Sequence, residues 1–188
     1  MSMAKQIRIA VVDDEKLFAS ALGAWLQKAS DVAIVGYAGS GDEGWTLCSS
    51  TQPDVALVDV EMPGGDGLSL ARRLIEAFPD MRIIIMTGRV DPHTAWLAGR
   101  TGVHGLVDKT IEPQVFQNVV HTVAQGGSFQ SPAFKQIQSD YLADPEAFQK
   151  VLTNRELAVL RYLADAWDDE RIGAKLGISP QTVASHRK

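Results

Sequence analysis

The chain has 188 residues, a formal net charge of −5 and a single cysteine. This length suits one large domain or two small ones, and one cysteine excludes an intramolecular disulfide framework. No apolar run approaches the length needed to cross a bilayer, and the N-terminus carries no signal-peptide pattern. We therefore expect a cytoplasmic protein with no membrane partner, and the overall acidity by itself gives no sign of nucleic-acid binding.

The first 126 residues alternate between apolar, β-branched runs and segments with helical periodicity. The predicted strands are Ile7–Val12, Val32–Val35, Asp54–Val58, Arg82–Met86 and Gly105–Val107. A segment with apolar residues at helical spacing follows each strand. Strict alternation predicts an α/β fold with a five-stranded parallel, doubly wound sheet that helices cover on both faces.

The remainder of the chain has a different pattern. Residues 127–150 mix proline, glutamine and serine, and predict a linker with some helical content. Residues 151–188 predict a small all-α domain of short helices, including one at Asp169–Leu176. The turn Gly177–Pro180 then leads into another helix, and two short helices joined by a tight glycine-containing turn make a helix-turn-helix.

Polar side chains stand where the strands of the first domain end. Asp13 and Asp14 follow the first strand, Asp59 the third, Thr87 the fourth, and Lys109 the fifth. Parallel strands place their carboxyl ends at one edge, where open α/β sheets bind ligands. We therefore expect three carboxylates, a hydroxyl and an ammonium group to meet there.

Carboxylates that lie this close repel one another unless a cation binds or a proton is taken up. Magnesium prefers oxygen ligands and keeps several waters, so this cluster predicts a Mg²⁺ site. With the metal present, Asp59 is a candidate nucleophile that forms an acyl phosphate. Thr87 is placed to donate to a phosphoryl oxygen, and Lys109 to supply a positive charge.

These residues resemble the receiver domain of two-component response regulators, over about residues 5–125. The acidic pair Asp13-Asp14, the phosphoacceptor Asp59 with Met62-Pro63 and Gly67, the hydroxyl of Thr87 and Lys109 appear in the family's order. The resemblance implies a flavodoxin-like fold and a sensor histidine kinase as phosphoryl donor. It also implies that Mg²⁺ is held by Asp14, Asp59 and the backbone carbonyl of Glu61, with Asp13 acting through water. Such a protein catalyses its own phosphorylation and dephosphorylation, but is not an enzyme in the ordinary sense.

The chain departs from the receiver pattern at two positions. Many receivers carry an aromatic residue three positions before the lysine, where this chain has Leu106. Many also have proline after the lysine, where this chain has Thr110. Neither change removes the phosphorylation chemistry, but Leu106 leaves open how phosphorylation is relayed.

The last part of the chain resembles the LuxR-type helix-turn-helix, which beside a receiver marks the NarL/FixJ class. Three segments carry the resemblance: Leu152–Glu156, Ile172–Ser179 and Thr182–His186. It implies that the helix after the turn enters the major groove of promoter DNA, and that phosphorylation promotes a homodimer. Ser179 and Thr182 are candidate phosphate contacts, and Ala184, Ser185 and Lys188 lie on the face expected to approach bases. Family members continue beyond the position of Lys188, so we expect this sequence to be a shortened form.

Three alternatives remain open at this point. A regulator that works without phosphorylation, through protein or small-ligand contacts, would suit Leu106. A phosphohydrolase with an aspartyl intermediate would use the pair Asp59 and Glu61, but the sequence shows no inserted cap. The last domain could instead be a small helical interaction module.

Overall fold

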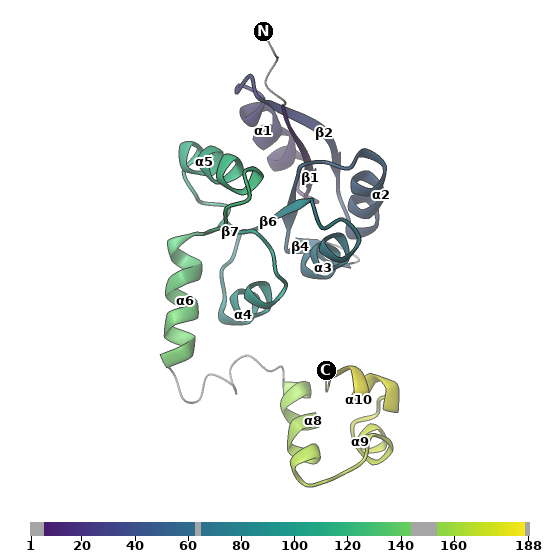
Figure 1. Cartoon of the computed structure of the whole chain (residues 1–188). Helices are drawn as coiled ribbons and strands as arrows, with labels where there is room; N and C mark the ends of the chain where they lie inside the picture. The colour runs from purple at the N-terminus through teal and green to yellow at the C-terminus, as the bar shows by residue number, and fades with distance from the viewer. Residues whose placement is uncertain (1–5, 63–64, 144–153, 187–188) are drawn as a thin grey trace. The chain divides into compact units, whose positions relative to one another are not determined.

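The computed structural model describes residues 6–62, 65–143 and 154–186, and the chain forms two compact units, residues 1–139 and residues 140–188. The first unit is a parallel sheet with helices on both faces, which confirms the predicted doubly wound α/β fold, although the sheet has six strands and not the five expected (Figure 1). No helix within the described ranges is long and apolar enough to span a membrane.

The sheet has six strands in the order β2-β1-β3-β6-β7-β8, and every neighbouring pair is parallel. Its strands are β1 (Ile7–Val12), β2 (Val32–Ala38), β3 (Val55–Asp59), β6 (Arg82–Thr87), β7 (Gly105–Asp108) and β8 (Phe129–Gln130). The apolar runs become the central strands because both of their faces are covered by helices. A small antiparallel pair, β4 (Glu61–Met62) and β5 (Gly65–Asp66), follows β3.

Two hydrophobic clusters separate the helices by face. The helices are α1 (Lys16–Leu26), α2 (Gly41–Thr51), α3 (Gly67–Ala77), α4 (Pro92–Arg100), α5 (Pro113–Ala124) and α6 (Pro132–Ala143). Residues of α1 and α5 share one cluster with one face of the sheet. Residues of α2, α3, α4 and α6 share the other. Helices therefore shield both faces, and only the ends of the strands remain available for a polar site.

Gly67 fixes α3 close to the end of β3. A Cβ atom at this position would lie 1.8 Å from the backbone oxygen of Asp59, which is a contact that no side chain can make. The Gly67 amide donates to the carbonyl of Val60 at 3.1 Å. Glycine is required here by close approach of two backbone segments, and this contact sets the path of the chain beside Asp59.

The structure differs from the expected linker at residues 127–150. The backbone after α5 adds β8 to the edge of the sheet, and α6 follows it. Phe134 of α6 is fully buried in the core of the first unit. Residues up to 139 therefore pack with the first unit, beyond the boundary expected near residue 127. Residues 144–150 of the expected linker lie outside the described residues.

The second unit contains α8 (Asn154–Ala164), α9 (Asp169–Leu176) and α10 (Pro180–His186). Val159, Ile172 and Val183, one from each helix, are fully buried and form its core. Gly177 ends α9 with a φ of 65°, a left-handed conformation that favours glycine. The expected pair of short helices with a tight glycine-containing turn is thus present.

Candidate functional site

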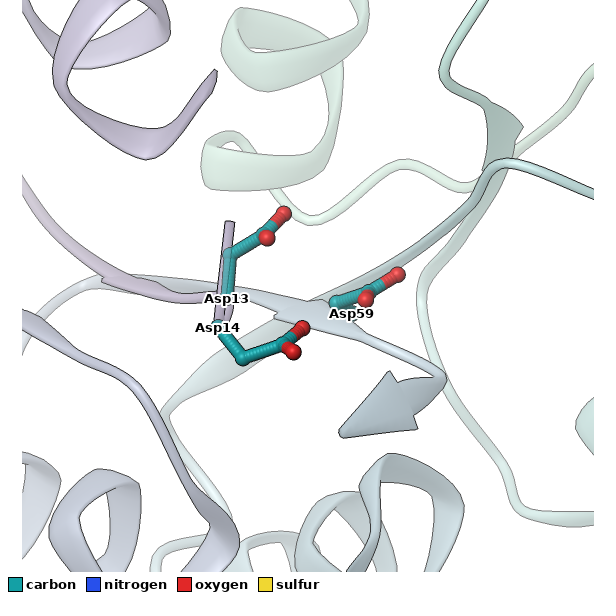
Figure 2. Close-up of side chains that lie close together, drawn as sticks. All are labelled: Asp13, Asp14 and Asp59. Carbon is teal, nitrogen blue, oxygen red and sulfur yellow. The ribbon is translucent and has the colours of Figure 1, made fainter. Parts of the chain in front are cut away.

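Three carboxylates meet where β1 and β3 end, as the sequence predicts. Asp13, Asp14 and Asp59 each place one oxygen so that the three atoms lie within 4.8 Å of one another. Asp13 and Asp14 leave the end of β1 toward different sides, with Asp59 across from them (Figure 2). They meet because the ends of β1 and β3 are neighbours, with Val12 beside Val58 in the register.

Lys109 directly follows β7 and contacts this cluster. Its Nζ lies 2.9 Å from Oδ2 of Asp13 and 3.5 Å from Oδ2 of Asp59. A third carboxylate, Glu15, contacts the same Nζ at 2.9 Å. Desolvation alone would lower the pKa of Lys109, but hydrogen bonds to Glu15 and Asp13 and the charge of Asp59 raise it. Lys109 therefore stays protonated and offsets part of the negative charge.

Glu15 is a site residue to which the sequence analysis assigned no role. The hydrogen bond with Lys109 lowers the pKa of Glu15 below its usual value. Its position directly after the acidic pair was the available signal. Its partner lies 94 residues away in the sequence, so only the folded sheet shows the contact.

Asp59 is the most constrained carboxylate of the site. Its side chain is nearly fully buried, and desolvation raises its pKa to about 6; Lys109 opposes this rise and Asp13 adds to it. The Oδ1 atom of Asp59 is buried and accepts no hydrogen bond from any described residue. A carboxylate with such a pKa is mostly ionised at neutral pH, and this one has an oxygen that protein donors do not satisfy.

The donor set suits a hard divalent cation. Mg²⁺ takes oxygen ligands, usually one or two carboxylates with the remainder from carbonyls, water or phosphate. The unsatisfied oxygen of Asp59 and the crowded carboxylates are what such an ion would stabilise. Glu61 lies at the start of β4 with an exposed side chain, so only its backbone is expected to take part.

Thr87 reaches the same edge of the sheet but is engaged elsewhere. It is fully buried at the end of β6, and its hydroxyl donates to the carbonyl of Arg89 at 2.8 Å. The same hydroxyl accepts from the Arg89 amide at 3.1 Å. Thr87 thus holds the loop between β6 and α4, and donation to a phosphoryl oxygen would require it to release the Arg89 carbonyl.

The candidate DNA-contacting residues of the second unit are only partly described. Ser179 accepts a hydrogen bond from the Thr182 amide at 3.0 Å, and their hydroxyls lie 2.8 Å apart. Ser179 therefore caps α10. Ala184 is half-buried on α10. The side chain of Ser185 and all of Lys188 lie outside the described residues.

A close approach fixes the angle between α9 and the following turn. A Cβ atom on Gly173 would lie 2.7 Å from the carbonyl oxygen of Ile178. The Ile178 amide also donates to the carbonyl of Gly173 at 3.0 Å. Both contacts hold the turn against α9, which is the geometry of a helix-turn-helix.

Comparison with protein families assigns both parts of the chain. Residues 9–121 match the model of the response regulator receiver domain, and residues 150–188 match that of the bacterial regulatory proteins of the luxR family. An uncharacterized transcriptional regulatory protein of Bacillus subtilis, YxjL, is 30% identical over 96% of this chain and 86% of its own length. The nitrate/nitrite response regulator NarL of Escherichia coli is 28% identical, over 100% of this chain and 89% of its own length.

Solved structures agree with this assignment. The response regulator ChrA of a heme-sensing two-component system has a TM-score of 0.63 and 25% identity, over 96% of this chain and 86% of ChrA. RcsB of Salmonella enterica, solved bound to promoter DNA with a phosphomimetic, has a TM-score of 0.71 over 97% of this chain and 88% of RcsB. RcsB is 22% identical, so this similarity supports a shared fold and nothing further.

Proposed function

Because this chain belongs to the response regulators that join a receiver domain to a LuxR-type DNA-binding region, we propose that Asp59 is its phosphoacceptor. Phosphorylation of Asp59 then controls promoter binding by the second unit. The observation that carries this proposal is the state of Asp59: a buried carboxylate with one unsatisfied oxygen, beside a partly buried lysine and two further carboxylates.

The reaction is a phosphoryl transfer from a phosphohistidine of a sensor histidine kinase. One carboxylate oxygen of Asp59 forms the new bond to phosphorus while the bond from phosphorus to the histidine nitrogen breaks, and that nitrogen keeps the electron pair. Asp14, Asp59 and the Glu61 carbonyl would hold Mg²⁺, with Asp13 contributing through water; the ion would neutralise charge on the phosphoryl oxygens. A pKa of about 6 leaves Asp59 ionised, and thus nucleophilic, at neutral pH.

Lys109 and Thr87 would respond to the new charge. Lys109 already contacts Asp59 and Asp13, and a short movement transfers its ammonium group to a phosphoryl oxygen. Thr87 exchanges the Arg89 carbonyl for a phosphoryl oxygen. A phosphate group adds charge and strong acceptors, which is sufficient to bias a two-state element.

The second unit would supply the output. We expect α10 to enter the major groove, with Ser179 and Thr182 near phosphates and Ala184, Ser185 and Lys188 toward the bases. Because Ser179 also caps α10, its hydroxyl has limited capacity for a second contact. A homodimer formed on phosphorylation would bring two such units to a two-fold symmetric promoter site.

Intact-mass measurement tests the phosphoacceptor directly. The protein is incubated with acetyl phosphate, with and without Mg²⁺, beside the Asp59→Asn and Glu61→Gln variants. We expect one phosphoryl adduct that requires both Asp59 and Mg²⁺. Glu61→Gln is the matched control, since this neighbouring acid is exposed and only its backbone is expected to act. A folded protein without an adduct would instead support a regulator that works without phosphorylation.

A further inference from the structure

The helix α6 is built into the receiver. Phe134 is fully buried in a core cluster that also contains Ala95 and Ala98 of α4 and Leu106 of β7. Ile137, one turn further along α6, packs against the same cluster. Phe134 and Ile137 therefore both face the first unit, although the sequence immediately around them is largely polar.

The strand β8 brings α6 to this position. The Phe129 amide donates to the carbonyl of His104 at 3.0 Å, and the Ser131 amide donates to that of Leu106 at 2.8 Å. Leu106 is 2% exposed. The residue at the position where many receivers carry a switching aromatic is therefore held in the core beside β8 and Phe134.

A side-chain contact joins α6 to α4. The side-chain amide of Gln138 donates to the backbone carbonyl of Ala95 at 3.1 Å. Gly99 permits this approach, because a Cβ atom there would lie 2.9 Å from Nε2 of Gln138. Figure 1 shows α6 alongside α4. The packing of α6 against α4 thus depends on small residues of α4, and a modest shift of α4 would disturb this packing.

The start of α4 is coupled to the phosphorylation site. Thr87 holds the loop before α4 through both the amide and the carbonyl of Arg89. Its single hydroxyl proton cannot be donated to the Arg89 carbonyl and to a phosphoryl oxygen at the same time. A change at Asp59 that recruits Thr87 therefore releases the loop that leads into α4.

We propose that residues 129–139 form a latch on α4 and β7, and that phosphorylation of Asp59 releases it. This inference rests on the proposed function of Asp59. The second unit begins at residue 140, directly after this segment in the sequence, so release of residues 129–139 would free the point where the DNA-binding region is attached. The latch would then relay phosphorylation to the second unit. In many receivers an aromatic residue at the position of Leu106 takes this role through a change of its rotamer, and an aliphatic side chain has no such ring.

Coupling of this kind is reciprocal. If a phosphoryl group favours the released state, then weakening the latch must favour occupancy of the phosphorylation site by the same factor. Loss of one hydrogen bond, such as that of Gln138 with Ala95, corresponds to about a fivefold change in the docking equilibrium. Where only the released state accepts the ligand well, apparent affinity rises with the released fraction.

The test combines hydrogen exchange with binding of beryllofluoride, used with Mg²⁺ as a mimic of the phosphoryl group. The full chain is compared with Gln138→Ala and with Lys135→Ala, which lies on the exposed side of α6 and serves as the matched control. We expect beryllofluoride to speed exchange over residues 132–139 by about fivefold or more, in line with the loss of one hydrogen bond. Gln138→Ala should speed exchange without ligand and strengthen beryllofluoride binding about fivefold, while Lys135→Ala should do neither.

Each other outcome has a distinct meaning. Beryllofluoride that binds without changing exchange over residues 132–139 would overturn the latch and leave the phosphoacceptor intact. Faster exchange in Gln138→Ala with unchanged beryllofluoride affinity would overturn the coupling. If beryllofluoride does not bind and acetyl phosphate gives no adduct, the proposed function fails and the latch fails with it. Gln138 is partly exposed, so its replacement leaves the core residue Phe134 in place.

Discussion

The two units of the chain bring their key residues together in different ways. In the first unit, the contact between Lys109 and Glu15 joins residues 94 positions apart, and the sheet alone makes them neighbours. In the second unit, the cap of α10 joins Ser179 to Thr182, three residues away. The first site therefore depends on the whole fold, whereas the helix-turn-helix follows from local sequence signals.

The units also differ in how much core supports them. Two large clusters stabilise the first unit, one on each face of the sheet. Among the described residues of the second unit, three fully buried apolar side chains form the core. Because a small unit buries a smaller share of its surface, we expect the second unit to unfold at lower denaturant concentration than the first.

Ile172→Ala should give the largest effect on this difference. Truncating a fully buried side chain of this size lowers the free energy of unfolding by about 2–5 kcal/mol. We expect a loss of this size to unfold the second unit, because its core is small. Hydrogen exchange measured at increasing temperature should show that the backbone amides of the second unit lose protection while those of the first unit keep it. Adduct formation with acetyl phosphate should be unchanged. Equal loss of protection in both units would contradict their independence.

Asp59→Asn should stabilise the first unit at neutral pH. The folded pKa of about 6 lies above the ordinary aspartate pKa of 3.8, so the folded state binds the Asp59 proton more tightly than the unfolded state. The stability of the wild type therefore falls as pH rises from about 4 to about 6, a difference of roughly 1–3 kcal/mol. Urea unfolding at pH 7.5 should show this gain in Asp59→Asn, and the gain should vanish near pH 4. A gain that is independent of pH would rule out the buried charge as its cause.

Gly177→Ala tests the local signal of the second unit. Gly177 has a φ of 65° and open space around its missing Cβ, so alanine would meet backbone strain without a steric clash. We expect a loss of about 1 kcal/mol in that unit, seen as a lower unfolding midpoint. Gly41 is the matched control: it also has open space, but lies in α2 without a positive φ. Gly41→Ala should be neutral or slightly stabilising, and similar losses at both positions would contradict this account.

The pair His121 and Asp31 should give the smallest effect. Nε2 of His121 lies 2.8 Å from Oδ2 of Asp31, and its Nδ1 lies 2.8 Å from the carbonyl oxygen of Gln117. The Gln117 carbonyl and Asp31 together raise the pKa of His121. This pair thus adds stability that is complete below the ordinary histidine pKa and is lost as pH rises through the raised one. NMR titration should show a lower pKa for His121 in Asp31→Asn, and an unchanged pKa would dismiss the ion pair.

The sequence predicted five of the six strands of the large sheet, the alternating helices and the meeting of Asp13, Asp14, Asp59 and Lys109, because apolar periodicity and strand ends determine them. It did not predict β8 and α6 as part of the receiver. A two-residue strand has no periodicity to detect, and Phe134 and Ile137 stand in a polar segment. The orientation of Thr87 was also beyond sequence reasoning, since its hydroxyl has two competing acceptors and only the structure shows which one it uses.

Chemical mapping of the phosphoacceptor tests the central claim most directly. An acyl phosphate is reduced by borohydride to an alcohol, which converts a phosphorylated aspartate to homoserine. The protein is treated with acetyl phosphate and Mg²⁺, reduced, digested and sequenced by mass spectrometry. Homoserine at position 59 alone, and only when Mg²⁺ and the phosphodonor are both present, is the predicted result. Homoserine at position 13 or 14, or none at all in a folded protein, would contradict the assignment of Asp59.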